Sequence, residues 1–223
     1  MIFIWGCQDT KIFKKHNKKE ILKIKKKFNI NKNEFVIVSP RSLQEHYNHE
    51  YLIKALSKIC KKYKNIKLIL FGYGNYYSHQ DNIFKLIEDL KLNKNLIFLP
   101  KLLNKKELAE IFNISDVCVS IPNSDQFSSA LVEGMACGSA PIVSDIPAYN
   151  EFLKNKTNAL YVNNKDEEDI ANNIIYLIKN RFIKNNFYRI NRIIILKNLD
   201  TKKQFKLMEN AYRDFLNESN SKF

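Results

Sequence analysis

The sequence predicts an α/β fold, in which a Rossmann-like parallel sheet of about six strands has helices on both faces and is followed by C-terminal helices. The first observation behind this prediction is a set of short, almost continuously apolar runs, as expected of strands that are covered on both faces. The second is that a segment of helical period separates each run from the next. The third is a length of 223 residues, 45% of them hydrophobic, which is enough for a substantial core without disulfides or metals.

The expected strands and helices alternate along the chain. Strands are expected at residues 35–38, 67–71, 96–99, 117–121, 141–143 and 159–162. Helices are expected between them at residues 49–63, 80–91, 104–113, 128–137, 147–154 and 166–180. Within 49–63, Leu52, Leu56 and Ile59 recur at spacings of four and three, which is typical of a helix with one buried face.

Two flanking segments lie outside this alternation. Residues 1–34 hold a short strand-like start and a lysine-rich helix at 18–28, whereas residues 181–223 predict two further helices. Asp200 is expected to cap the last helix, which runs through Leu216. This helix carries an apolar stripe formed by Phe205, Met208, Tyr212 and Phe215. The chain is therefore divided into residues 1–34, a central domain at 35–180 and a helical tail at 181–223.

The chain is strongly basic, with 37 Lys and Arg against 23 Asp and Glu, a net charge of +14 and a pI of 9.5. Such a charge favours polyanionic partners, namely nucleic acid, phosphorylated ligands or anionic lipid surfaces. The lysines are spread widely and accompany many Asn and Ile residues, as an AT-rich genome would produce, so we expect no nucleic-acid partner. No apolar run approaches the roughly 18 residues of a membrane-spanning helix, so we expect at most peripheral contact with an anionic membrane.

The cysteines and histidines do not predict a disulfide or a metal site. Cys60, Cys118 and Cys137 lie far apart beside apolar neighbours, which favours buried free thiols in a reducing compartment and predicts a cytoplasmic location. His46 and His49 stand near a helix start, but no third ligand accompanies them, so a surface position is expected for both.

Ligands of open α/β sheets bind at the carboxyl ends of the strands, so the residues after each run are the candidates for a site. Arg41 follows the first run, where its guanidinium can form two parallel hydrogen bonds to a phosphate; the alternative is a solvated surface arginine. Gly72 and Gly74 follow the second run, where they allow either close approach of a ligand or a plain tight turn.

The most informative stretch follows the fourth run. A loop with Asp125 leads into a helix that starts near Ser128 and contains Glu133. The start of a helix offers free N–H groups and the positive end of the helix dipole, which together bind phosphate. The Glu133 carboxylate can accept hydrogen bonds from vicinal hydroxyls such as those of a ribose, and Asp125 can do the same for the hydroxyls of a sugar. The spacing of the two carboxylates is by itself common in proteins.

The whole stretch resembles the retaining glycosyltransferases of family 4, the group 1 transferases, whose fold is the two-domain GT-B fold. Their hallmark in the second domain reads Glu-x7-Glu and continues through a helix of small residues to Gly-x-Pro-Val-Ile. In this sequence it reads Asp125-x7-Glu133 followed by Gly134-Met-Ala-Cys-Gly138-Ser-Ala-Pro141-Ile-Val143. Further matches follow the same order along residues 1–180: Ser39-Pro40-Arg41, Phe71-Gly72-Tyr73-Gly74, Ile114-Ser-Asp116-Val-Cys-Val119 and Asn158-Ala-Leu-Tyr-Val162.

The resemblance implies transfer of a sugar from a nucleotide-sugar to a glycan or lipid-linked acceptor, with retention of configuration and no metal or other cofactor. It implies that residues 35–180 form the nucleotide-sugar-binding domain, the GT-B C-terminal half. Arg41 and Asp125 are the catalytic residues that it implies. The implied donor-binding residues are Gly72, Gly74, Phe127, Ser128, Ser129, Ala130, Leu131 and Glu133.

The sequence departs from the family pattern at several positions. Asp125 stands in place of the first Glu, Ser128 in place of a Gly, and Pro100 where a Gly commonly follows the third strand. The phosphate-binding Lys of the family falls at Tyr47 or Asn48. Its loss predicts weaker neutralisation of a diphosphate.

The start of the chain resembles the linker that follows the acceptor-binding half of the family. This linker is matched by Ile4-Trp5-Gly6-Cys7-Gln8-Asp9, so residues 1–34 are expected to be a remnant of the interdomain linker together with an N-terminal helix. The chain is then a donor half, active only with a separate N-terminal polypeptide. The alternatives are an inactive remnant that only binds nucleotide and a basic nucleic-acid-binding protein.

Overall fold

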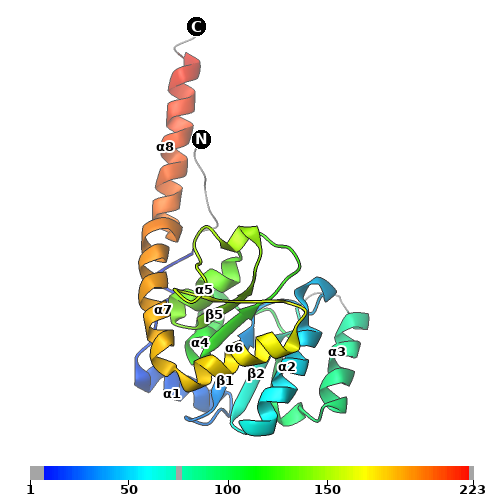
Figure 1. Cartoon of the computed structure of the whole chain (residues 1–223). Helices are drawn as coiled ribbons and strands as arrows, with labels where there is room; N and C mark the ends of the chain where they lie inside the picture. Colours follow the sequence, from blue (N-terminus) through cyan, green and yellow to red (C-terminus); the bar gives the residue numbers. More distant parts are fainter. Residues whose placement is uncertain (1–7, 74–76, 221–223) are drawn as a thin grey trace.

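The computed structural model describes residues 8–73 and 77–220 and contains a six-stranded parallel sheet, which confirms the expected α/β class (Figure 1). The strands follow the spatial order β3-β2-β1-β4-β5-β6. Their bounds are β1 Phe35–Ser39, β2 Ile66–Phe71, β3 Leu96–Leu99, β4 Val117–Ser120, β5 Ala140–Ser144 and β6 Leu160–Val162. Each of the six strands lies within one residue of its predicted range at either end.

The order of the strands reverses between β1 and β4, which are neighbours although they are far apart in the sequence. Their register pairs Ile37 with Val117 and Val38 with Cys118. A reversal of this kind leaves a crevice at the carboxyl ends of the two strands, where open α/β sheets bind their ligands. The loops after β1 and β4 therefore form the edge on which a site is expected.

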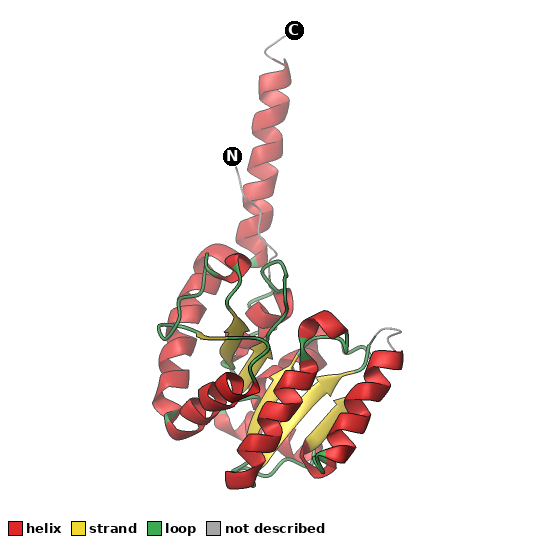
Figure 2. Ribbon diagram, turned by 45° about the vertical axis from the view of Figure 1, so that its right-hand side comes forward, coloured by secondary structure: helices red, strands yellow, loops and turns green. Residues whose placement is uncertain are grey.

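Helices cover both faces of the sheet, as Figure 2 shows. One face packs against α2, α3 and α6, and the other against α1, α4 and α5. Alternation within β1 shows why the run is continuously apolar: Ile37 belongs to the first core, whereas Val36 and Val38 belong to the second. The helix bounds are α1 Lys18–Lys27, α2 His49–Lys62, α3 Tyr77–Asp89, α4 Lys105–Ile114, α5 Ser129–Cys137, α6 Glu167–Lys179, α7 Arg181–Ile194 and α8 Thr201–Asn220.

The described parts of both flanks contribute to the core. Phe13 is fully buried and Ile24 of α1 is 7% exposed, while Phe187 of α7 is 2% exposed. The two flanks also join, because the N–H of Gln8 donates to the carbonyl of Leu199 at 2.9 Å. The divisions at residues 34 and 180 stay a prediction, and residues 1–7 of the expected linker lie outside the described part.

The helix predicted at residues 147–154 is wrong. The structure has a single 3-10 turn, Pro147–Tyr149, followed by an irregular loop. Asn158 explains the difference, because its side chain accepts a hydrogen bond from the N–H of Lys154 at 2.7 Å and donates one to the carbonyl of Phe152 at 2.9 Å. The first of these bonds engages an N–H group that a continuous helix would use within itself.

The tail ends in a helix that projects from the body of the molecule (Figures 1 and 2). Residues Ile195–Leu199 form a π-helical turn between α7 and α8. Asp200 then accepts hydrogen bonds from the N–H groups of Lys202 and Lys203, which confirms the predicted cap. Phe205, Tyr212 and Phe215 on α8 are 55%, 64% and 66% exposed, so their apolar surface faces solvent.

Candidate nucleotide-binding site

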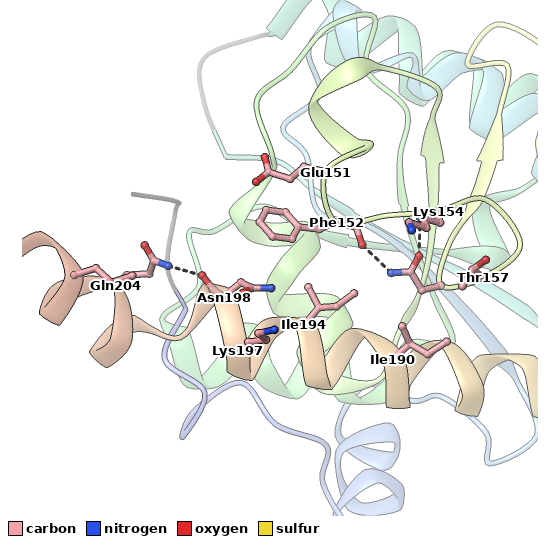
Figure 3. Close-up of a pocket in the computed structure, with 11 residues that line it drawn as sticks. Glu151, Phe152, Lys154, Thr157, Ile190, Ile194, Lys197, Asn198 and Gln204 are labelled. Carbon is pink, nitrogen blue, oxygen red and sulfur yellow. Dashed lines mark hydrogen bonds between the residues drawn. The ribbon is translucent and has the colours of Figure 1, made fainter. Parts of the chain in front are cut away.

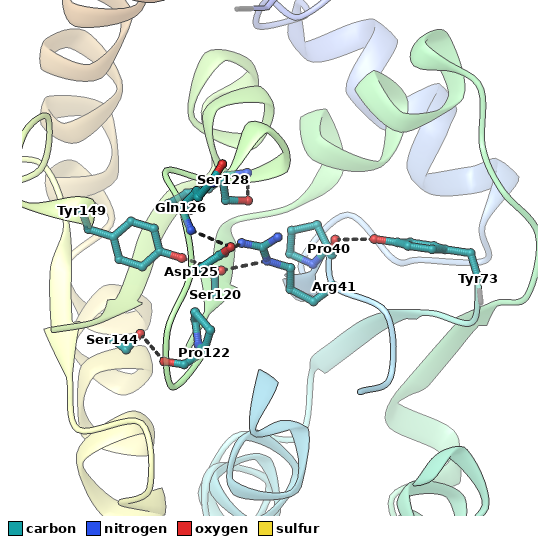
Figure 4. A network of polar contacts seen from close by, with 11 residues as sticks. Pro40, Arg41, Tyr73, Ser120, Pro122, Asp125, Gln126, Ser128, Ser144 and Tyr149 are labelled. Carbon is teal, nitrogen blue, oxygen red and sulfur yellow. Dashed lines mark hydrogen bonds and ion pairs between the residues drawn. The ribbon is translucent and has the colours of Figure 1, made fainter. Parts of the chain in front are cut away.

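Arg41 and Asp125 meet across the edge of the sheet, although 84 residues separate them (Figure 4). The guanidinium of Arg41 forms an ion pair with the Asp125 carboxylate, and its Nε–H donates to Oγ of Ser120 at 3.2 Å. The two charged side chains are 12% and 19% exposed. The structure thus brings together the two residues that the sequence singled out as catalytic, in direct contact with each other.

The loops after β1 and β4 are joined to each other by further hydrogen bonds. The side chain of Asn48 donates to the carbonyl of Ile121 at 2.8 Å, and the N–H of Asn123 donates to the carbonyl of His46 at 2.9 Å. Tyr73 adds a contact from the loop after β2, since its hydroxyl donates to the carbonyl of Pro40 at 3.1 Å. These contacts fix the backbone on both sides of Arg41.

Tyr47 covers one face of the Arg41 guanidinium. The guanidinium carbon lies 4.9 Å from the centre of the Tyr47 ring, which is a cation–π arrangement. Tyr47 is one of the two candidates for the position of the family lysine, and the other, Asn48, points at the loop after β4. The loop therefore holds its arginine rigidly but supplies no second cation between residues 40 and 48.

The start of α5 lies beside this ion pair. Ser128 caps the helix, because its Oγ accepts a hydrogen bond from the N–H of Leu131 at 3.3 Å. The earlier N–H groups, at Ser129 and Ala130, have no partner within a helix and lie at its positive end. The helix packs closely on β4 because Gly134 has no side chain: an added Cβ would lie 3.1 Å from Sγ of Cys118.

Glu133 is the buried carboxyl group of α5, with 9% of its surface exposed. Burial raises its pKa to about 7, and the charge of Lys105 offsets this only in part. The group is therefore poised to titrate near neutral pH. A carboxyl group in this state gains from a ligand that donates hydrogen bonds to its charged form.

Arg41, Asp125 and the start of α5 form a cluster at this edge of the sheet. Two further residues belong to this cluster and were not identified from the sequence. Ser120 at the end of β4 and Tyr149 after β5 are 1% and 0% exposed, and their hydroxyl oxygens are 3.1 Å apart. The Tyr149 ring lies 6.1 Å from the ring of Phe127, edge to face. A tyrosine in a predicted helix gave no signal of this contact, which arises only when the β5 loop folds over β4.

The remaining predicted residues fall in different surroundings. Gly72 directly follows β2, and an added Cβ would clash with the Phe98 ring, so packing accounts for this glycine. Leu131 is fully buried in the core, so the structure does not bring its side chain to the surface of the cluster. Gly74 lies outside the described residues.

The predicted surface position of His49 is wrong. The side chain is 1% exposed, and its Nε2 lies 3.2 Å from Oγ of Ser39, beneath the loop that carries Arg41. Burial lowers the pKa of His49 to about 3, so the ring is neutral. In the described part of the chain, no three His, Cys, Asp or Glu side chains are grouped to hold a metal, and no helix is long and apolar enough to cross a membrane. Cys118 and Cys137 are buried free thiols, as predicted, whereas Cys60, also predicted to be buried, is a free thiol that is only half-buried.

A cavity of about 610 Å³ lies next to the cluster but shares no residue with it (Figure 3). It is bounded by the loop after β5, by α7 and by the start of α8. Phe152 separates the two regions, since it lines the cavity and its ring lies 5.1 Å from that of Phe127. The other lining residues are Glu151, Lys154, Thr157, Asn158, Ile190, Ile194, Lys197, Asn198, Gln204 and Leu207.

The fold and this edge define the chain as one half of a GT-B glycosyltransferase fold. The structure superposes on the Anabaena protein HepE in complex with UDP and glucose with a TM-score of 0.85, 17% identity and coverage of 94% of this chain and 56% of that one. It also matches the C-terminal domain of a glycosyl transferase group 1 family protein from Francisella tularensis, with a TM-score of 0.77, 17% identity and coverage of 87% and 99%.

The chain belongs to the glycosyl transferases group 1, whose family model matches residues 20–194. Among curated relatives, it is 22% identical over 201 residues to N-acetyl-alpha-D-glucosaminyl L-malate synthase of Bacillus anthracis. That match covers 90% of this chain and 51% of the relative, so the chain spans about half the length of this relative.

Proposed function

We propose that this chain binds the nucleotide-sugar donor of a retaining glycosyltransferase and transfers the sugar together with an N-terminal acceptor-binding half. The observation that carries the proposal is the Arg41 guanidinium, which two loops hold at the topological switch point beside the start of α5. A guanidinium next to free N–H groups is suited to the diphosphate of such a donor. The UDP bound by HepE in its complex is a ligand of this class.

The chemistry that this edge can support is stabilisation of a leaving group. When the bond between the sugar and the diphosphate breaks, negative charge accumulates on the departing phosphate. Arg41, once the diphosphate has displaced Asp125 from it, and the N–H groups of Ser129 and Ala130 lie where they can stabilise this charge. Neither the proposal nor the family resemblance requires a metal ion, and the absence of a metal requirement stays a prediction.

The two carboxylates have separate roles in the proposal. Glu133, buried behind the helix start, accepts hydrogen bonds from the vicinal hydroxyls of the ribose, and binding favours its charged form. Asp125 orients the hydroxyls of the donor sugar once the diphosphate has replaced it on Arg41. Phe127 packs against the rings of Tyr149 and Phe152 and shapes the donor loop.

The acceptor half is proposed as a separate or preceding segment, because the chain spans about half the length of its relatives. We assign two surfaces to contact with that half. One is the apolar stripe on α8 with Phe205 and Tyr212, and the other is the cavity beside Phe152. A glycan or lipid-linked acceptor, as in polysaccharide biosynthesis, and a place at the cytoplasmic face of an anionic membrane remain predictions of the sequence.

Calorimetric titration of the chain with UDP and with GDP tests the proposal. Saturable binding of one of them, lost in Arg41→Ala, supports a donor site. Transfer should need both the chain and a matching N-terminal half; nucleotide binding without transfer in that mixture favours the inactive remnant. Binding of duplex DNA that falls steeply with salt, with no nucleotide binding, would instead identify a nucleic-acid-binding protein.

A further inference from the structure

A chain of two hydrogen bonds links the loops after β1 and β5 through the end of β4, at the carboxyl edge of the sheet (Figure 4). The Tyr149 hydroxyl, after β5, lies 3.1 Å from Oγ of Ser120 at the end of β4. The same Oγ accepts the Nε–H of Arg41, after β1, at 3.2 Å. Tyr149 is therefore connected to the guanidinium through a single intervening atom.

Burial makes this connection rigid. Tyr149 and Ser120 are 0% and 1% exposed, so water does not compete for their hydroxyl groups. A buried hydroxyl without a partner is costly, which holds the two oxygens at hydrogen-bonding distance. The Tyr149 ring is fixed in turn by Phe127, whose ring meets it edge to face at 74°. Burial also raises the pKa of Tyr149, so the phenol stays protonated at neutral pH.

The guanidinium has three kinds of contact in the protein, and they are not equivalent. Asp125 forms the ion pair, Tyr47 covers one face at 4.9 Å, and Ser120 accepts the Nε–H. A guanidinium has five N–H donors, so these bonds leave others for a ligand. A bound diphosphate competes with the Asp125 carboxylate for the same cation, whereas the Ser120 contact on Nε can persist.

We propose that Tyr149 is a positioning residue that, through Ser120, sets the orientation in which Arg41 meets the diphosphate of the donor. The inference rests on the proposed function and adds a residue to it. Two parallel hydrogen bonds to a phosphate need the plane of the guanidinium to be fixed. Ser120 fixes one edge of that plane and Tyr47 its face, so the diphosphate meets an arginine that is already aligned.

The test compares UDP with UMP, because Arg41 is assigned to the diphosphate. Tyr149→Phe removes one buried oxygen and keeps the ring against Phe127. We expect the affinity for UDP to fall about three- to tenfold, the range of one lost hydrogen bond, and that for UMP by less than about twofold. Ser120→Ala should reproduce this pattern, and the double variant should lose no more than Ser120→Ala alone, because the effect of Tyr149 passes through Ser120.

Tyr161→Phe is the matched control. Its hydroxyl also bonds within the β5 loop, to Oδ1 of Asn150 and to the carbonyl of Leu153, both at 2.9 Å, but it has no link to Arg41. The UDP-to-UMP affinity ratio should stay as in the unaltered chain. Ser120→Ala keeps the test decisive if Tyr149→Phe does not fold.

Two results overturn the inference in distinguishable ways. If the unaltered chain binds neither UDP nor GDP, the proposed function fails and the positioning role fails with it. If the chain binds UDP but Tyr149→Phe or Ser120→Ala leaves the ratio unchanged, or weakens both nucleotides equally, only the positioning role fails. Additive losses in the double variant also overturn it.

Discussion

The Asp125 carboxylate is paired with the Arg41 guanidinium, so an acidic side chain of the protein holds the cation that we assign to the donor diphosphate. Both groups are largely buried, which strengthens their attraction relative to a surface pair. A diphosphate must displace this carboxylate before it can use the full guanidinium. The ion pair therefore orders Arg41 and at the same time competes with the ligand.

Asp125→Asn should strengthen UDP binding by up to about tenfold, or about 1.4 kcal/mol, because a neutral amide competes less well for Arg41. Transfer of sugar by the reconstituted enzyme should fall, since Asp125 is assigned to the donor sugar. Calorimetry with UDP measures the first effect. Asp145→Asn, on the exposed loop after β5, is the control and should change neither. Weaker UDP binding in Asp125→Asn contradicts the competition.

Glu133→Gln should raise the free energy of unfolding of the protein, measured without nucleotide, at pH 8. Burial raises the pKa of Glu133 from 4.5 to about 7, so between these values the folded state keeps a proton that the unfolded chain has lost. The free energy of unfolding contributed by this group therefore falls as pH rises from 4.5 to 7 and is level above 7. Because Gln does not titrate, we expect the variant to be more stable by about 1–3 kcal/mol at pH 8 and equal to the parent near pH 4.5.

Urea unfolding at the two pH values measures this difference. Glu88→Gln, an exposed site on α3, should show no such dependence on pH. A constant offset between Glu133→Gln and the parent across the range would show that the carboxyl group does not titrate as described.

The same Glu133→Gln change should weaken UDP binding at pH 8 by about 1–3 kcal/mol, because the ribose hydroxyls lose a charged acceptor. In the parent, affinity should rise as Glu133 ionises toward pH 8, beyond any change that the variant also shows. At pH 8 the variant should therefore be more stable than the parent but bind UDP more weakly. Calorimetry from pH 6 to 8 on both proteins checks this. Unchanged affinity with an intact fold removes Glu133 from the site.

Arg41→Lys should reduce affinity for UDP more than for UMP or uridine. A lysine ammonium is a point charge that cannot form the two parallel hydrogen bonds of a guanidinium and does not stack on Tyr47 as its planar group does. We expect a loss of about 1–3 kcal/mol for UDP, measured by titration with the three ligands. Equal losses for all three would assign Arg41 to the structure of the loop instead.

Replacing Phe205 and Tyr212 by Gln should reduce self-association of the purified chain and its binding of a hydrophobic dye. Both side chains are more than half exposed on the projecting helix, and such apolar patches promote association. Gln keeps helix propensity close to that of the surrounding residues. Sedimentation and dye fluorescence measure the effect, with Lys206→Gln on the same helix as the control. If the parent chain is monomeric and binds no dye, the prediction is wrong.

Local sequence was enough to locate the six strands and all but one of the helices predicted between them. Asn104 shows why: its side chain accepts a hydrogen bond from the N–H of Glu107, and the Glu107 carboxylate accepts one from the N–H of Asn104. The start of α4 is therefore fixed by residues three apart. Asp166 caps α6 with its side chain alone, which accepts hydrogen bonds from the N–H groups of Glu168 and Asp169. The prediction of a helix at 147–154 was wrong because the side chain of Asn158, which lies beyond that range, hydrogen-bonds to backbone groups within it.

The sequence by itself determined the succession of strands and helices along the chain and the cap at Asp200, because these depend on periodicity and on neighbours a few positions apart. It singled out Asp125 and Glu133 by their place after the fourth strand and by the family resemblance. Only the tertiary structure decided what these residues touch. Parallel strands are joined by long connections, so residues such as Arg41, Ser120 and Tyr149 meet only at the edge of the completed sheet. Glu133 and His49 are likewise buried by segments that are distant in the sequence. Their pKa values are shifted for this reason, because desolvation depends on every segment that covers a group.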